Sequence, residues 1–136
     1  MATETQWRSI WVELAGATVR IVKGKKYSTR VIEAGSGEPL ILVHGIGGYA
    51  EAYARNVMNL AKDFHVYAID ALYHGFSTKE PFDSEQTTLR QAEAIIDLMD
   101  AEGHQQAYIK GESMGSNIAF EFGLKFPDRA KKLVLD

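Results

Sequence analysis

The chain has 136 residues, a formal net charge of −3 at pH 7 and no cysteine. This length fits one domain, and the charge gives no basic surplus for nucleic acid or for an anionic membrane surface. Without cysteine there is no disulfide, no thiolate nucleophile and no thiolate metal site. The first residues lack the basic and apolar regions of a signal peptide, and no apolar run has the length of a membrane span. We therefore expect a cytoplasmic protein.

Alternating apolar residues predict antiparallel strands in the first quarter of the chain. Residues 7–14 place Ile10, Val12 and Leu14 on one side, which favours a strand there. Two further segments alternate in the same way and are joined by a glycine and lysine turn; they span residues 17–23 and 28–34.

Further along the chain, short apolar runs alternate with segments of helical spacing. The runs predict strands at residues 40–43, 65–69, 107–110 and 132–136, and the helical spacing predicts helices within 50–62, 87–102 and 117–126. Gly103 follows the second of these segments and is a typical residue just after a helix end. Strands that alternate with helices favour a mainly parallel sheet with helices on both faces.

A G-x-S-x-G pattern at residues 111–115 occupies the turn between a predicted strand and a predicted helix. A serine at the tip of such a turn is the context that a nucleophile elbow requires. The glycines fit because the turn is strained and brings backbones close together. We therefore predict that Ser113 is a nucleophile; the alternative is a turn serine that binds only local backbone groups.

A second glycine-rich bend, His44 to Gly48, follows the strand at 40–43. Backbone N–H groups in such a bend can point into a cleft and form an oxyanion site. Asp70 ends the next strand and is followed by the sequence ALYHGFS, which contains His74.

The chain resembles the α/β-hydrolase superfamily in four patterns, namely HGxGG, D-x-x-x-H-G-x-S, G-x-S-x-G and the final K-L-V-L strand. The resemblance covers nearly all of the chain from about Val31. The residues within the motifs are most similar to those of meta-cleavage-product (carbon–carbon bond) hydrolases and related esterases. The resemblance implies a three-layer α/β/α sheet with strand order 1-2-4-3-5-6. Members run to about twice this length, so we expect residues 1–136 to form a single, partial core domain, truncated after the sixth strand and without a cap domain.

The resemblance also implies roles for particular residues. The oxyanion site would consist of the backbone N–H groups of Ile46 and Met114. Family members carry the catalytic histidine after the elbow, but all four histidines of this chain precede Ser113. His44 and His74 are therefore both candidate bases, although His44 usually has a structural role in the family.

Asp136 matches the place where some α/β hydrolases carry the catalytic acid; the alternative is a polar residue at a chain end. Asp70 is expected to hold the loop around His44 and His74. His65 and His104 are expected at the surface. No pair of histidines has a metal-ligand spacing and no Walker loop is present, so we expect neither metal nor cofactor.

These observations predict a serine hydrolase that cleaves small carboxylic esters through an acyl-enzyme on Ser113. Two alternatives stay open: an inactive hydrolase fragment that self-associates, and half of a carbon–carbon hydrolase. Glu112 disfavours the carbon–carbon hydrolase, because a carboxylate beside the site would repel an anionic dienoate. The strand at 132–136 would form an exposed apolar edge, so we expect a homodimer or a higher homo-oligomer.

Overall fold

The computed structural model describes residues 4–136 and contains one six-stranded sheet with helices on both faces. The strands are β1 (Thr18–Lys23), β2 (Ser28–Ala34), β3 (Pro39–Val43), β4 (His65–Ile69), β5 (Ala107–Gly111) and β6 (Ala130–Leu135). The helices are α1 (Ile10–Glu13), η1 (Ala50–Tyr53), α2 (Val57–Leu60), α3 (Thr87–Glu102), α4 (Met114–Lys125) and η2 (Pro127–Arg129), where η marks 3₁₀ turns.

The strand order β1-β2-β4-β3-β5-β6 confirms the predicted hydrolase order. β1 pairs with β2, and β2 with β4, in antiparallel fashion; β4, β3, β5 and β6 are parallel neighbours. Because the parallel strands share one direction, the loops after β3, β4 and β5 emerge at the same edge of the sheet. Ligand sites of open α/β sheets form at this carboxyl edge.

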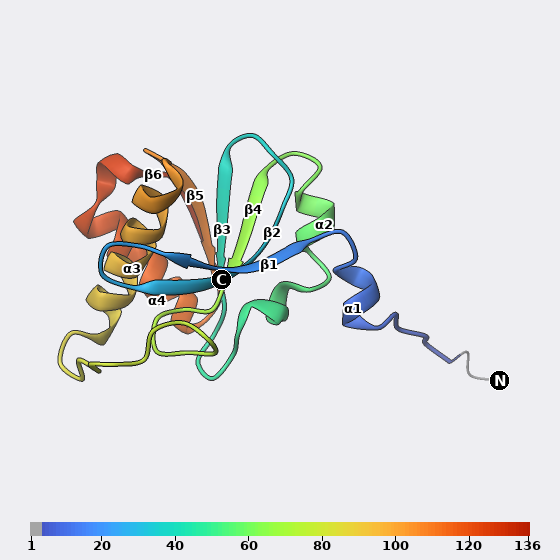
Figure 1. Cartoon of the computed structure of the whole chain (residues 1–136), viewed down its shortest axis with the longest axis horizontal. Coiled ribbons are helices and arrows are strands. Elements are labelled where there is room, and N and C mark those ends of the chain that lie inside the picture. Colours follow the sequence, from blue (N-terminus) through green and yellow to red (C-terminus); the bar gives the residue numbers. More distant parts are fainter. Residues whose placement is uncertain (1–3) are drawn as a thin grey trace.

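Alternation along β3 shows how the sheet separates two cores. Ile41 and Val43 pack with α3 and α4 on one face, whereas Leu40 and Leu42 pack with η1 and α2 on the other. Figure 1 shows α3 and α4 on one side of the strands and α2 with α1 on the other. All four β3 side chains named here are buried, as expected for a central parallel strand.

The predicted strand over residues 7–14 is wrong, because residues 10–13 form the short helix α1. Ser9 caps it by accepting a hydrogen bond from the N–H of Trp11 (3.3 Å). Ile10 and Leu14 are four residues apart, so a helical turn places both against the same core cluster while Val12 stays 49% exposed. The spacing of Ile10 and Leu14 fits both periods, and the serine cap favours the helix.

Three other boundaries differ from the prediction. The helix expected within 50–62 is divided into η1 and α2, which are separated by a turn in which Asn56 N–H donates to Tyr53 O (2.9 Å). The helix after the elbow begins at Met114, and the last strand begins at Ala130. The helix over 87–102 is confirmed, and Gly103 ends it in a left-handed conformation with φ 75°.

Candidate active site

Ser113 lies at the tip of a sharp turn between β5 and α4. Its φ is 53° and its ψ is −116°, a backbone conformation that side-chain-bearing residues rarely adopt. The flanking glycines are required by close backbone contacts: a Cβ at Gly115 would overlap the carbonyl oxygen of Val43, and one at Gly111 would overlap that of Gly115. The sequence therefore folds locally into a strained turn that holds the exposed Ser113 at the carboxyl edge of the sheet.

The bend after β3 runs directly beside Ser113. A Cβ at Gly45 would lie 3.4 Å from the Cβ of Ser113 and 3.9 Å from its Oγ. Gly48 N–H donates to Gly45 O (3.0 Å), which closes the bend. Within residues 4–136, the N–H groups of Ile46 and Met114 have no hydrogen-bond acceptor. Free backbone donors next to a serine hydroxyl are the elements from which an oxyanion site is built.

His44 is fully buried, and both of its ring nitrogens are engaged. Nε2 accepts a hydrogen bond from the N–H of Ala71 (3.0 Å), so the proton is on Nδ1, which donates to Gly45 O (2.6 Å). Burial is the main reason why the pKa of His44 is lowered, which keeps the ring neutral. The ring thus ties the bend after β3 to the loop after β4, which is a structural role.

His74 lies in that second loop, edge-on to His44 with the ring centroids 5.1 Å apart. It is half-buried, and its Nδ1 is 3.2 Å from the carbonyl oxygen of Leu72. A proton on Nδ1 is required for that hydrogen bond, which leaves the lone pair of Nε2 available. Because His74 keeps one ring nitrogen free and His44 does not, His74 is the stronger of the two candidate bases, and its role stays a prediction.

Asp70 is the buried anchor of both loops. Its carboxylate accepts hydrogen bonds from the N–H of Ala50 (2.8 Å) and of Phe76 (2.9 Å). Arg30 on β2 lies 3.3 Å from Asp70 Oδ1 and binds both carboxylate oxygens of Glu51 at 2.8 and 2.7 Å. Asp70 therefore holds the loops that carry His44 and His74, as expected.

The charges of this anchor stabilise each other. The hydrogen bonds to Glu51 are the main reason why the pKa of Arg30 is raised, and Arg30 in turn lowers the pKa of Glu51. Sequence analysis did not identify Arg30 or Glu51. The only signal was an arginine within a strand whose neighbours are mostly buried, at a position where a charge needs a partner.

Asp136 contacts the elbow through its main chain. Its carbonyl oxygen accepts from the N–H of Ser113 (2.9 Å), and its N–H donates to Gly111 O (3.1 Å). Its side chain is 71% exposed, with Oδ2 3.4 Å from Nζ of Lys110. The end of β6 therefore fixes the backbone of the nucleophile candidate, while a role of the carboxylate as catalytic acid stays a prediction.

A model of the alpha/beta hydrolase fold matches residues 38–136. The chain belongs to this family. It is 33% identical over 121 residues to mouse 1-acylglycerol-3-phosphate O-acyltransferase ABHD5, covering 86% of this chain and 34% of that protein. It is 34% identical over 110 residues to 2-hydroxymuconate semialdehyde hydrolase of Pseudomonas sp. strain CF600, covering 79% of this chain and 38% of that protein.

The solved structures lead to the same family. A serine hydrolase from Cycloclasticus zankles superimposes with a TM-score of 0.82 at 28% identity, over 88% of this chain and 45% of that one. This alpha/beta hydrolase chain thus spans about a third of the length of the mouse and Pseudomonas relatives. The activities of the full-length relatives are therefore only proposals for this chain.

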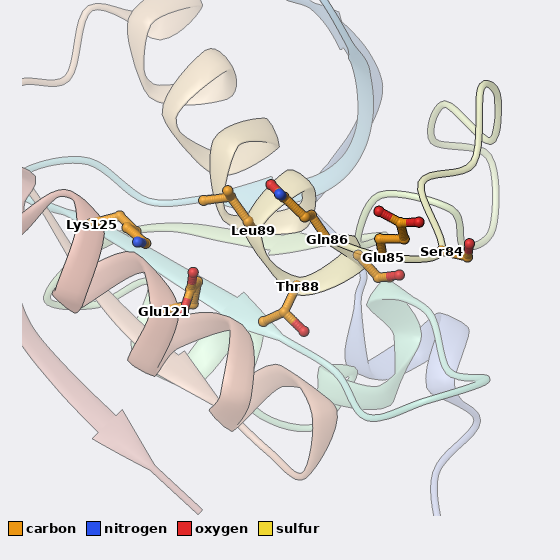
Figure 2. A pocket seen from close by; sticks show the side chains of 8 residues that line it. Ser84, Glu85, Gln86, Thr88, Leu89, Glu121 and Lys125 are labelled. Atoms are coloured by element: carbon orange, nitrogen blue, oxygen red, sulfur yellow. The ribbon is translucent and has the colours of Figure 1, made fainter.

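Two hollows of similar size differ in their relation to the elbow of this alpha/beta hydrolase. A groove of about 520 Å³ lies along the η1 and α2 face of the sheet and reaches Glu112, the residue before Ser113; its sheet side is formed by Leu40, Leu42, Tyr108, Lys110 and Val134. The other, about 530 Å³, is lined by residues 84–89, which lead into the first turn of α3 and are polar except for Leu89, and by Glu121 and Lys125 of α4 (Figure 2). The second hollow contains no residue of the elbow or its loops.

The remaining two histidines lie at the opposite end of β4 from the candidate site. Contrary to expectation they are half-buried, because each has a partner: His65 Nε2 is 2.8 Å from Glu33 Oε2, and His104 Nε2 is 2.8 Å from the hydroxyl of Tyr67. Across residues 4–136, no group of three or more His, Asp or Glu side chains is arranged to hold a metal ion. No helix in the same residues is long and apolar enough to cross a membrane.

Proposed function

We propose that this chain carries the nucleophile of a serine hydrolase that cleaves carboxylic esters through an acyl-enzyme on Ser113. The observation that carries the proposal is the conformation of Ser113, whose strained backbone presents the hydroxyl beside the bend at Gly45. Strain of this kind persists where the surrounding structure determines it and is concentrated at active sites. Membership of the alpha/beta hydrolase family supports the same reading.

In the proposed reaction, Oγ of Ser113 attacks the acyl carbon of the ester and transfers its proton to a base. The carbonyl oxygen becomes an oxyanion between the N–H groups of Ile46 and Met114, each such donor being worth on the order of a hundredfold in rate. The alcohol leaves with the proton, and the serine ester remains. Water then attacks this ester, which releases the carboxylic acid and restores the hydroxyl of Ser113.

The base limits the rate that we expect from these 136 residues. His44 uses both ring nitrogens within the fold, so His74 is the first candidate, and Asp136 is the candidate acid. Enzymes that lack members of the triad still accelerate the reaction roughly 10³–10⁴-fold over water through binding and the oxyanion site. We therefore expect slow hydrolysis of small, activated esters.

Carbon–carbon bond hydrolysis is the second candidate, because one relative is named a 2-hydroxymuconate semialdehyde hydrolase. Glu112 is exposed next to Ser113, and a carboxylate there disfavours an anionic dienoate. A neutral ester has no such penalty, so the ester reading is preferred. An inactive, self-associating fragment is the reading that remains if neither substrate class is turned over.

The test is hydrolysis of short-chain p-nitrophenyl esters by the wild-type chain, by Ser113→Ala and by Ser116→Ala. Ser116 lies one turn along α4 and serves as the matched control. We expect slow turnover that Ser113→Ala abolishes and Ser116→Ala retains. Equal rates for the wild type and Ser113→Ala would contradict the proposal. Assaying His74→Ala and His44→Ala beside them separates the candidate bases, with the larger loss of kcat expected for His74→Ala in a chain that remains folded.

A further inference from the structure

The hydroxyl of Tyr53 reaches from the last residue of η1 to the end of β3. Tyr53 is only 4% exposed, and its hydroxyl donates a hydrogen bond to the carbonyl oxygen of Val43 at 3.0 Å. The two residues are ten positions apart, and the bend from His44 to Gly48 lies between them. The hydrogen bond therefore closes the segment that carries Ile46, whose N–H is one of the two donors of the proposed oxyanion site.

The carbonyl oxygen of Val43 also contacts the elbow. It accepts a second hydrogen bond from the N–H of Glu112 (3.1 Å), and it leaves no space for a Cβ at Gly115. A carbonyl oxygen has two lone pairs, so the hydroxyl of Tyr53 and the N–H of Glu112 satisfy it completely. The bend and the elbow that holds Ser113 thus meet at one oxygen atom, and Tyr53 fixes the direction of the peptide group to which this oxygen belongs.

The position of Tyr53 is itself well determined. The N–H of Ala50, the first residue of η1, donates to Oδ1 of Asp70 (2.8 Å), and the side chain of Tyr53 packs in the buried cluster that contains Leu42 and Val57. A 3₁₀ turn of four residues has little stability of its own, so these contacts decide where the turn lies. The hydroxyl is therefore held in place from both ends of η1.

The surroundings of Tyr53 keep its hydroxyl protonated. Burial, followed by the nearby carboxylates of Glu112 and Asp136, raises the pKa of Tyr53 to about 12. Only the protonated phenol donates a hydrogen bond to a carbonyl oxygen. The contact with Val43 is consequently present at every pH at which ester hydrolysis would be assayed.

We propose that Tyr53 is a positioning residue whose hydroxyl fixes the distance between the bend at Ile46 and the elbow at Ser113. The inference rests on the proposed ester hydrolysis, because this distance acts through the two oxyanion donors, the N–H of Ile46 on the bend and that of Met114 on the elbow. Such donors stabilise the transition state when they lie about 2.7–3.1 Å from the oxyanion. Misplacement by about 1 Å costs on the order of a hundredfold in rate.

Tyr53→Phe tests the proposal, because it removes one oxygen atom and leaves the buried ring in place. The carbonyl oxygen of Val43 keeps its second donor, so the chain should fold. Tyr67→Phe is the matched control: Tyr67 is 1% exposed and packs on the α3 face, and its hydroxyl is hydrogen bonded to Glu102 and His104. Each variant loses one buried hydroxyl, and circular dichroism with thermal melting verifies that both are folded.

The kinetic test compares the two variants with the wild type on p-nitrophenyl esters. Tyr53→Phe should lower kcat roughly ten- to a hundredfold with little change in KM, because the oxyanion donors act in the transition state. The rate at which a fluorophosphonate labels Ser113 should fall by a similar factor. Tyr67→Phe should retain both rates. A Tyr53→Phe chain that matches Tyr67→Phe in kcat and in labelling rate would overturn the role in catalysis.

Amide hydrogen exchange followed by NMR tests the geometry without requiring activity. The N–H of Glu112 donates to the oxygen that Tyr53 holds, so it should exchange roughly fivefold faster in Tyr53→Phe than in Tyr67→Phe. The N–H of Phe122, inside α4, serves as the internal reference for global stability. Equal exchange of Glu112 in the two variants would overturn the proposal. A wild-type chain that is neither labelled nor turned over would overturn the hydrolase function and with it the role in catalysis, whereas faster exchange of Glu112 would still support the placement of the elbow by Tyr53.

Discussion

Replacement of Ser113 by glycine is expected to make the chain more stable than replacement by alanine. Ser113 has a φ of 53° with a ψ of −116°, outside the regions that residues with a Cβ favour. Such a conformation costs on the order of 1–3 kcal/mol, and alanine retains the Cβ that causes the cost. Glycine removes it, but the unfolded chain gains freedom worth roughly 0.5–1 kcal/mol. The net difference should therefore be about 1 kcal/mol in favour of glycine.

Thermal unfolding of the two variants measures this difference. Unfolding entropy of about 2.1 cal/mol/K per residue gives roughly 290 cal/mol/K for 136 residues, so 1 kcal/mol corresponds to about 3–4 °C in Tm. Ser116, inside α4, provides a control of opposite sign, because glycine in a helix is about 1 kcal/mol worse than alanine. A Ser113→Gly chain that melts at or below Ser113→Ala would refute the strained elbow.

Three further outcomes follow from buried charges and from the carboxylate next to the elbow. Burial lowers the pKa of His44 and of His104, so the unfolded chain binds more protons than the folded chain below pH 6.5. The free energy of unfolding should therefore be complete above that pH and should fall as the pH drops toward the folded pKa values. Denaturant titrations at pH 7.5 and 5.5 measure this loss. Glu112→Gln should raise kcat/KM for an anionic ester relative to a neutral one, and an unchanged ratio in paired assays would remove the electrostatic argument. Arg30→Met leaves the carboxylate of Asp70 buried without its cation, so the free energy of unfolding in urea should fall by about 3 kcal/mol. A decrease below about 1 kcal/mol would contradict that role of Arg30.

The parallel strands were predictable because their signals are local, whereas their order in the sheet came from the resemblance to the α/β-hydrolase superfamily. Each parallel strand is a short apolar run, and the glycine patterns after two of them identify the strand ends at the functional edge. The error at residues 7–14 has a physical cause: Ile10 and Leu14, four residues apart, lie on one face of a strand and on one face of a helix alike, and only Val12 distinguishes the two. The cap by Ser9, a single side-chain hydrogen bond, decides between the two.

The candidate site was predictable in part, for a related reason. The turn that holds Ser113 is specified by neighbours in sequence, and its conformation could be expected from the glycines. The state of His44 could not, because the N–H that occupies its Nε2 belongs to Ala71, and contacts between distant segments leave no trace in a single sequence. The same holds for Arg30, whose partners Glu51 and Asp70 come from two other elements.

Covalent labelling with a fluorophosphonate probe tests the central claim, that Ser113 is the nucleophile, most directly. The wild-type chain and Ser113→Ala are incubated with the probe, and intact mass with peptide mapping locates the adduct. We predict one adduct on the wild type, carried by the peptide that contains residues 111–115, and none on Ser113→Ala. An adduct on a different residue, an adduct that persists in Ser113→Ala, or a wild-type chain that the probe never modifies would contradict the claim.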